Sequence, residues 1–248
     1  MAKRIALVTG GTGGIGTAIC QRLCQEGHQV IATYSSAAKK DVALQWQAEQ
    51  KELGFVVEVV CMNVSSFESC AEAAELIRSE YGNVSILVNN AGITRDGVMK
   101  KMGHDKWDAV LSTNLDSVFY VTKQFLDQMI DANYGRIVNV SSINAQKGQF
   151  GQVNYSAAKA GIHGFTKALA QEVARKGITV NTISPGYVAT SMVMAIDQSV
   201  RDQIIAQIPV GRLAEPAEIA RAIAFLTAEE AGFMTGSNLA INGGQHMC

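Results

Sequence analysis

The fold of this chain is decided by the stretch RIALVTGGTGGIG, residues 4–16. Its first half, Arg4–Thr9, is a short apolar run typical of a strand covered on both faces. Glycines follow at once, and apolar residues at helical spacing continue until Gly27. This order of strand, glycine turn and helix suits a dinucleotide, because glycines let the backbone approach a pyrophosphate and the helix N-terminus offers free N–H groups. A tight turn without a ligand is the alternative.

The alternation of strand and helix continues along all 248 residues, and it predicts an α/β fold. Further strands are expected at Gln29–Thr33, Phe55–Cys61, Val84–Val88, Gly135–Ser141, Ile178–Ser184 and Leu239–Ile241. Helices are expected at Val42–Leu53, Phe67–Tyr81, Trp107–Ile130, from Val153 towards Gly177, and at Glu218–Leu226. We therefore predict one Rossmann-type domain over residues 1–248, with a doubly wound parallel sheet of about seven strands and helices on both faces. Residues 191–215 are expected to form an irregular helical lid over the substrate.

The composition excludes several classes of function. The formal net charge is −1, so no basic surface indicates a nucleic acid or an anionic membrane as partner. No apolar run is long enough to span a bilayer, and no signal-peptide core follows the first residues, so a cytoplasmic protein is expected. The five cysteines and four histidines lack metal-type spacing, and no metal site is predicted.

Tyr155 and Lys159 indicate a catalytic site. They lie four residues apart in a helical pattern. That spacing puts an ammonium beside a phenol on one helix face, and we expect the cation to lower the phenol pKa. A phenol tuned in this way can act as a general acid. Ser142 lies thirteen residues earlier at the end of a strand, where its hydroxyl can approach the phenol. Taken alone, the pair is more often a solvated helix face.

Four motifs together resemble those of the short-chain dehydrogenase/reductase family. They are T-G-x-x-x-G-x-G at 9–16, N-N-A-G at 89–92, the Ser142, Tyr155 and Lys159 triplet, and P-G-x-x-x-T at 185–190. The resemblance implies a nicotinamide-dependent oxidoreductase with Asn114, Ser142, Tyr155 and Lys159 as catalytic residues. It implies that Asn114 distorts its helix and relays a water to Lys159, which also holds the nicotinamide ribose.

The coenzyme is expected to be NADPH rather than NADH. An acidic residue at the end of the second strand would hold a ribose 2′-hydroxyl, but here no acid appears before Asp41. Hydroxyls and two lysines are available there for a phosphate instead, although Gly13 stands where many NADP-dependent members carry Arg. A solvated helix start is the alternative for the lysines. The residues predicted to bind the coenzyme are Gly10, Thr12, Gly13, Gly14, Ile15, Gly16, Tyr34, Ser35, Ser36, Lys39, Lys40, Asn63, Val64, Asn90, Ala91, Gly92, Tyr155, Lys159, Pro185, Gly186, Val188 and Thr190.

The substrate is indicated by the loop at 144–155, with the segments 93–96, 185–187 and 242–247. These resemble the family members that reduce acetoacetyl-CoA to (R)-3-hydroxybutyryl-CoA with NADPH in polyhydroxybutyrate synthesis. The resemblance implies a homotetramer with the Tyr155 helix in one interface. It also implies a substrate pocket formed by Asp96, Ser142, Gln149, Phe150, Gln152, Tyr155 and Tyr187.

Two other functions stay open. One is reduction of 3-oxoacyl thioesters on acyl-carrier protein in fatty acid synthesis, for which Arg95, Lys100 and Lys101 offer basic surface. The other is a non-catalytic NADPH-binding protein, against which the intact Ser142, Tyr155 and Lys159 argue. Acyl chain length, strictness of coenzyme choice and regulation do not follow from the sequence.

Overall fold

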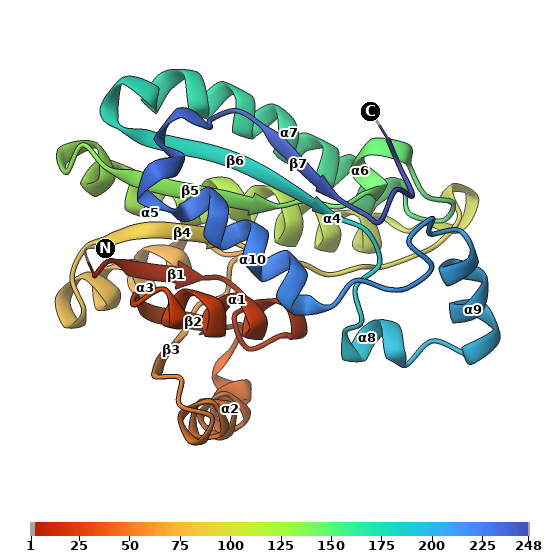
Figure 1. The fold of residues 1–248 in the computed structure, drawn as a ribbon, viewed down its shortest axis with the longest axis horizontal. Coiled ribbons are helices and arrows are strands. Elements are labelled where there is room, and N and C mark those ends of the chain that lie inside the picture. The colour runs from red at the N-terminus through yellow and green to blue at the C-terminus, as the bar shows by residue number, and fades with distance from the viewer. Residues whose placement is uncertain (1–2, 248) are drawn as a thin grey trace.

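A computed structural model describes residues 3–247, which are built around one parallel sheet (Figure 1). Its seven strands lie in the order β3-β2-β1-β4-β5-β6-β7, and every neighbouring pair is parallel. The strands are β1 (Ile5–Val8), β2 (Gln29–Tyr34), β3 (Val57–Cys61), β4 (Val84–Asn89), β5 (Gly135–Val140), β6 (Ile178–Pro185) and β7 (Asn238–Ile241). The predicted doubly wound α/β fold is confirmed.

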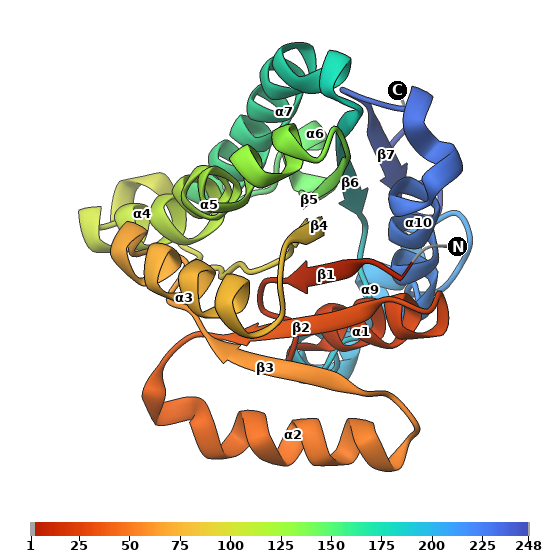
Figure 2. The same ribbon diagram turned by 90° about the vertical axis from the view of Figure 1, so that its left-hand side faces the viewer.

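Helices cover both faces of the sheet, as Figure 2 shows. One face packs on α1 (Gly14–Gln25) and α10 (Pro216–Thr227), and the other on α3 (Phe67–Glu80), α5 (Ser117–Asp131) and α7 (Val153–Val173). Helix α2 (Lys40–Glu52) lies beside β3 at the edge. Short 3-10 turns occur at Ala37–Lys39, Met99–Lys101, Ala174–Lys176 and Glu229–Phe233. Within residues 3–247, no helix combines the length and apolarity needed to cross a membrane.

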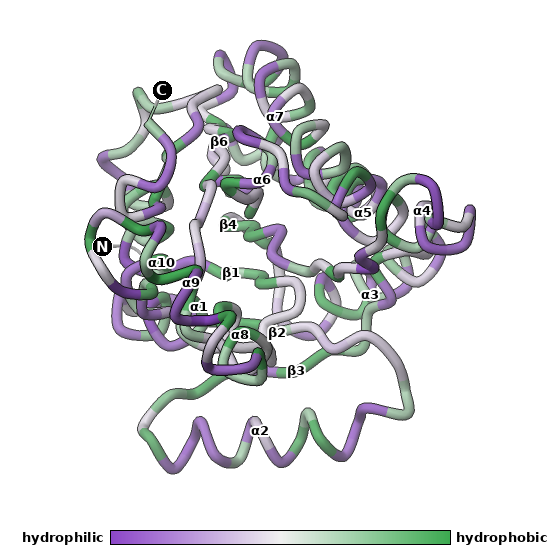
Figure 3. The backbone as a smooth tube through the Cα atoms, turned by 90° about the vertical axis from the view of Figure 1, so that its right-hand side faces the viewer, coloured by the Kyte–Doolittle hydropathy of each residue, from purple (hydrophilic) through white to green (hydrophobic). Residues whose placement is uncertain are grey.

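The unbroken apolar strands follow from this two-sided burial. In β1, Ala6 and Val8 enter the core under α1 and α10, whereas Leu7 enters the core under α3, α5 and α7. All three are fully buried, because successive strand residues point to opposite faces and both faces are covered. Figure 3 shows β1 and β4 as hydrophobic segments in the centre of the molecule.

The strand order reverses between β1 and β4, and this places the binding cleft. In an open parallel sheet, ligands bind where the order reverses, outside the carboxyl ends of the strands. The turn after β1 and the segment after β4 therefore lie next to each other. Three short helices lie beyond the same ends: α6 (Asn144–Lys147), α8 (Ser191–Met194) and α9 (Gln198–Ala206) (Figure 1). The segment 191–215, expected to be irregular and helical, contains the two short helices α8 and α9.

The single helix predicted at 107–130 is wrong in one respect. The chain forms α4 (His104–Leu111) and α5, separated by a π-helical segment at Ser112–Asp116. Inside this segment, the Asn114 side chain accepts a hydrogen bond from the backbone N–H of Ile93 and donates one to its carbonyl, both at 2.8 Å. The widened turn is stabilised by these bonds to a distant loop, so helical periodicity alone does not indicate it.

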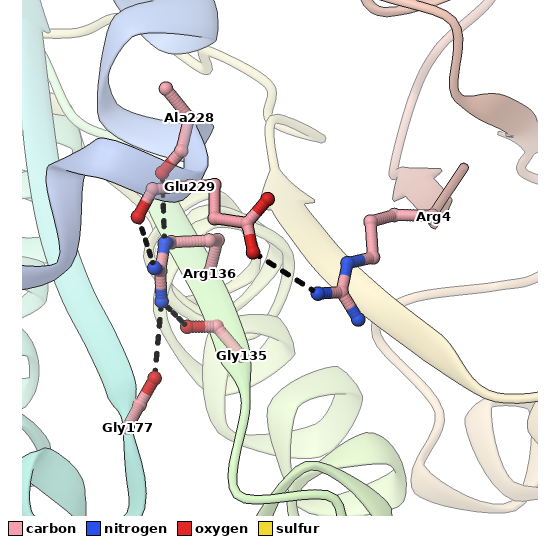
Figure 4. Close-up of polar contacts among 6 residues, drawn as sticks. All are labelled: Arg4, Gly135, Arg136, Gly177, Ala228 and Glu229. Atoms are coloured by element: carbon pink, nitrogen blue, oxygen red, sulfur yellow. Dashed lines mark hydrogen bonds and ion pairs between the residues drawn. The ribbon is translucent and has the colours of Figure 1, made fainter. Parts of the chain in front are cut away.

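At the end of the sheet away from the cleft, a buried arginine forms hydrogen bonds with several segments of the chain (Figure 4). Arg136 on β5 is 4% exposed, and its guanidinium donates to the carbonyls of Gly135, Gly177, Ala228 and Glu229 at 2.9–3.1 Å. It also lies 4.5 Å from the centre of the Tyr134 ring. A buried cation is tolerated only when its donors are satisfied, and here backbone oxygens satisfy it. The arginine thus joins β5, the start of β6 and the end of α10.

Candidate active site

The glycine turn is built so closely that side chains are excluded from it. Gly10 adopts a left-handed φ of +61°, and its carbonyl accepts from the backbone N–H of Gly13 at 3.1 Å. A Cβ on Gly16 would lie 2.3 Å from the same carbonyl oxygen. Gly13 precedes α1 without any side-chain cap, so the first N–H groups of the helix remain available to a ligand. These donors and the positive end of the helix dipole favour a phosphate.

Asn90 and Thr9 fasten this turn to the end of β4. The Asn90 amide nitrogen donates to the carbonyls of Thr9 and Gly10 at 3.0 and 3.2 Å. The Thr9 hydroxyl accepts from the backbone N–H groups of Asn90 and Ala91, both at 3.0 Å. The N-N-A-G motif therefore holds the glycine turn in place through these hydrogen bonds. Its residues Asn90, Ala91 and Gly92 also line the cleft.

A cleft of about 680 Å³ runs along the carboxyl ends of the strands. Its predicted lining residues are Gly10, Thr12, Gly13, Gly14, Ile15, Gly16, Tyr34, Ser35, Lys39, Asn63, Val64, Asn90, Ala91, Gly92, Ser142, Tyr155, Lys159, Pro185, Gly186 and Thr190. Ser36, Lys40 and Val188 were also expected to bind the coenzyme, but they lie outside the lining.

Ten further residues line the cleft and were not among the predicted site residues, namely Thr33, Val42, Ala43, Met62, Ile93, Thr94, Thr113, Val140, Ser141 and Ser191. Most of them are adjacent in sequence to a predicted residue. Where a strand ends at the cleft, the residues next to a predicted one reach the cleft too.

The shape and charge of this cleft fit a phosphate-bearing dinucleotide. The glycine turn provides a cradle that Cβ atoms would fill, since a Cβ on Gly14 would meet the Thr190 side chain at 3.0 Å. None of the described lining residues is acidic, and Lys39 and Lys159 supply positive charge. Among residues 3–247, no group of histidines, cysteines and carboxylates is arranged to hold a metal ion.

Ser142 and Tyr155 meet in the cleft as predicted. The Ser142 hydroxyl oxygen accepts from the backbone N–H of Asn144 at 3.1 Å, which leaves its own proton free to donate. It also hydrogen-bonds with the Tyr155 phenol. Ser142 follows β5 directly, and Tyr155 lies in the first turn of α7, so the contact depends on how α7 packs against the sheet.

Lys159 lies deeper, beneath Tyr155. It is 3% exposed, its ammonium donates to the Val140 carbonyl at 2.7 Å, and it lies 5.8 Å from the centre of the Tyr155 ring. Burial lowers the pKa of Lys159 to about 8, because the charged form loses its hydration. The amine therefore lies over the phenol ring and is hydrogen-bonded to the backbone of β5.

The expected lowering of the Tyr155 pKa is wrong for this structure. Burial raises the pKa of the phenol, the hydrogen bond with Ser142 lowers it, and the Asp96 carboxylate raises it further. The helical spacing predicted the neighbouring ammonium correctly, but it carries no information about loss of solvent around the ring. Burial disfavours the phenolate and outweighs the other effects. Tyr155 is therefore held in its protonated form at neutral pH.

Asn114 distorts its helix as expected. Its side chain is fully buried, and both ends of its amide are bonded to Ile93, in the loop directly after N-N-A-G. A Cβ on Gly92 would lie 2.7 Å from the Asn114 oxygen and 3.5 Å from the Lys159 nitrogen, so the two side chains approach each other across this glycine. The π-helical turn is thus positioned beside the amine.

Five of the predicted substrate residues are not among the residues that line the cleft, namely Asp96, Gln149, Phe150, Gln152 and Tyr187. The Gln152 amide donates to the Asp96 carboxylate at 2.9 Å and accepts from Asn144 at the same distance. The Asp96 charge raises the pKa of both Tyr155 and Tyr187, after the larger effect of burial, so it lies near both phenols. Gln149 accepts from Lys147 at 3.0 Å, and the Phe150 ring is 86% exposed.

The comparisons with known proteins agree with this geometry. The model of the short chain dehydrogenase family matches residues 4–201. An acetoacetyl-CoA reductase of Cupriavidus necator is 57% identical over 247 residues, which is 100% of both chains. An acetoacetyl-CoA reductase of Allochromatium vinosum is 54% identical over 98% of this chain and 99% of its own. A 3-oxoacyl-[acyl-carrier-protein] reductase of Vibrio cholerae is 44% identical over 98% of each chain.

Proposed function

This chain belongs to the short chain dehydrogenase family, and from that premise we propose that it reduces acetoacetyl-CoA to (R)-3-hydroxybutyryl-CoA with NADPH. The observation that carries the proposal is the meeting of Ser142 and Tyr155 in a cleft that also contains a glycine cradle. The full-length similarity to acetoacetyl-CoA reductases supports the choice of substrate.

In the proposed reaction, bound NADPH supplies the hydride that reaches the 3-oxo carbon. Tyr155 donates a proton to the oxygen as negative charge grows on it, and its raised pKa keeps the phenol in the form that donation requires. Ser142 donates a hydrogen bond to the same oxygen, since accepting from the Asn144 N–H leaves the hydroxyl proton available. The Lys159 ammonium, held against Val140, stabilises the phenolate that remains.

We assign two supporting roles from the family resemblance. Lys159 also holds the nicotinamide ribose, which suits an amine that faces the cleft. Asn114 supports a water that resupplies the proton, and the π-helical turn beside Lys159 supports that role because it displaces backbone carbonyls from regular helical bonds.

We propose NADPH as the coenzyme because Lys39 lines the cleft close to the end of β2. Tyr34 and Ser35 line the same part, and none of the described lining residues carries a carboxylate that would repel a 2′-phosphate. Lys40 adjoins Lys39 but lies outside the lining. An enzyme that uses NADPH and CoA thioesters works where both are made, so we place it in the cytoplasm.

The acyl group and pantetheine are proposed to contact Asp96, Gln149, Phe150, Gln152 and Tyr187. The hydrogen-bonded pair of Asp96 and Gln152 presents polar groups near Tyr155, and the exposed Phe150 ring is free to pack on a short acyl chain. Helices α8 and α9 are proposed to close over the substrate as a lid. We propose that residues 1–248 work as one domain.

We further propose a homotetramer with α7 in one interface. Large apolar side chains remain exposed on two faces, which favours burial by other copies. Phe119 on α5 and Val153 on α7 are 51% and 43% exposed, while Phe225 on α10 and Phe233 after it are 56% and 103% exposed. The mass of the assembly in solution tests this directly.

The alternative function is reduction of a 3-oxoacyl group on acyl-carrier protein. The relative from Vibrio cholerae and the exposed Arg95, Lys100 and Lys101 favour it, because a carrier protein is acidic. The two substrates are compared as acetoacetyl-CoA and acetoacetyl-carrier protein in the same NADPH oxidation assay. We expect the larger kcat/KM for acetoacetyl-CoA. A large preference for the carrier protein would reverse the order, and no oxidation with either would leave a non-catalytic NADPH-binding protein.

A further inference from the structure

The inner face of α7 carries polar side chains where it packs against the sheet. Thr166 is 1% exposed, and its hydroxyl oxygen lies 2.9 Å from the Asn139 amide nitrogen and 2.8 Å from the Thr182 hydroxyl. One turn closer to the active site, His163 follows on the same face. A shift of α7 along the sheet would leave these buried groups unpaired, which is unfavourable for every buried polar group that loses its partner. Hydrogen bonds therefore fix the position of the helix.

His163 contacts Ser141, the residue between the end of β5 and Ser142. Its Nε2 lies 2.9 Å from the hydroxyl oxygen of Ser141, and that hydroxyl lies 2.9 Å from the Lys159 carbonyl. A hydroxyl has one proton, and the carbonyl can only accept, so the Ser141 proton is used there. His163 must then donate from Nε2 to Ser141.

A second hydroxyl supports the same assignment of the His163 tautomer. The hydroxyl of Ser184 on β6 lies 3.4 Å from the same Nε2, and it donates to the side-chain amide oxygen of Asn238 at 2.7 Å. Its oxygen is therefore also free to accept. Nε2–H is present in one neutral tautomer and in the charged imidazole alike, so the donor persists when His163 changes its charge.

His163, Ser141 and Lys159 are joined by hydrogen bonds next to the catalytic groups, and we call this set of three residues the clamp. Lys159 forms two hydrogen bonds here: its ammonium donates to the Val140 carbonyl at the end of β5 at 2.7 Å, and its backbone carbonyl accepts from the Ser141 hydroxyl. Ser142 is the next residue along the chain. The position of Ser141 therefore affects Lys159 and Ser142 together.

We propose that His163 is a positioning residue, which fixes Ser142 relative to Tyr155 and Lys159 by donating a hydrogen bond to Ser141. It touches neither substrate nor coenzyme, and it acts on the rate because general-acid catalysis depends on geometry. A displacement of about 1 Å in such a site costs up to about 10²-fold in rate. The inference rests on the proposed reductase activity.

The test compares His163→Leu with His163→Gln, whose amide nitrogen can replace Nε2 as the donor. Ser141→Ala breaks the clamp from the other side. Thr166→Val is the matched control, since it removes buried hydrogen bonds from the same interface without touching Ser141 or Lys159. The measurements are kcat and KM for acetoacetyl-CoA, Kd for NADPH from coenzyme fluorescence, and Tm.

We expect His163→Leu and Ser141→Ala to lower kcat by about 10- to 100-fold, with KM and Kd within about twofold. His163→Gln should recover most of kcat. Thr166→Val should lower Tm and keep kcat. A near-normal kcat in Ser141→Ala, a failure of His163→Gln to exceed His163→Leu, or an equal loss in Thr166→Val would each overturn the proposal.

A crystal structure of the Ser141→Ala variant tests the positioning role independently of the substrate, because it shows the distance between Ser142 and Tyr155 directly. We expect Ser142 and Tyr155 to separate in it, and an unchanged contact would overturn the positioning role. If the unaltered protein fails to reduce acetoacetyl-CoA, the proposed function is wrong. The structure of the variant still shows whether Ser141 fixes the position of Ser142.

Discussion

Burial of Lys159 makes the stability of the folded protein depend on pH in a way that can be measured. The amine is 3% exposed, and its pKa is lowered from 10.5 to about 8. Between these two values the unfolded chain binds a proton that the folded chain does not. The free energy of unfolding therefore rises with pH in this window, because the cost of burying the charge disappears.

The size of the effect follows from the gap between the two pKa values. At about 1.4 kcal/mol per pH unit, the buried ammonium costs about 3 kcal/mol at neutral pH. Linkage predicts that about 2 kcal/mol of this cost is relieved between pH 7 and 9.5. The buried thiols of Cys20, Cys24 and Cys70 act in the opposite direction, since burial raises their pKa values. A comparison of variants removes their contribution.

The assay is urea unfolding of the wild type and of Lys159→Met at several values between pH 7 and 9.5. We expect the free energy of unfolding of the wild type to rise by about 2 kcal/mol relative to that of Lys159→Met over this pH range. Lys167→Met, which removes an exposed lysine from the same helix, should show no such change relative to the wild type. A difference between wild type and Lys159→Met that stays constant across this range would refute the argument that Lys159 is desolvated.

Three further predictions concern the turn, the coenzyme and the buried arginine. Gly16→Ala places a Cβ 2.3 Å from a backbone oxygen and should abolish NADPH binding in a fluorescence titration, whereas Gly164→Ala, with open space around it, should bind normally. Lys39→Ala should raise KM for NADPH by about tenfold, as expected for loss of a charge-assisted contact, and leave KM for NADH unchanged. Lys40→Ala is its control, and equal effects of the two substitutions would contradict the assignment. Arg136→Met should lower the free energy of unfolding by at least about 2 kcal/mol, because four carbonyls lose a donor, yet kcat of the folded variant should persist.

The fold followed from the sequence because local pattern and tertiary burial agree along most of it. The strand Ile5–Val8 is apolar at every position because both faces of the sheet are covered, and this is visible as an unbroken run. The glycine turn was predicted for a similar reason. A Cβ at Gly16 would collide with the backbone, so the geometry requires the residue that the motif contains.

The features that residue spacing alone did not indicate depend on contacts between distant segments. The π-helical turn at Asn114 depends on Ile93, twenty-one residues away, and helical spacing does not reveal that bond. The pKa of Tyr155 depends on how much solvent the fold removes, whereas the sequence showed only a neighbouring cation. His163 had no recognisable pattern, because its partner Ser141 lies just after β5, twenty-two residues earlier.

The most direct test of the proposed chemistry is the rate of acetoacetyl-CoA reduction by Tyr155→Phe, measured together with its Kd for NADPH. The substitution removes the proton donor and keeps the ring that packs beside Lys159. We expect kcat to fall by about 10²- to 10⁴-fold, while Kd for NADPH stays within about twofold of the wild type. Turnover close to that of the wild type would contradict the assignment of Tyr155 as the general acid.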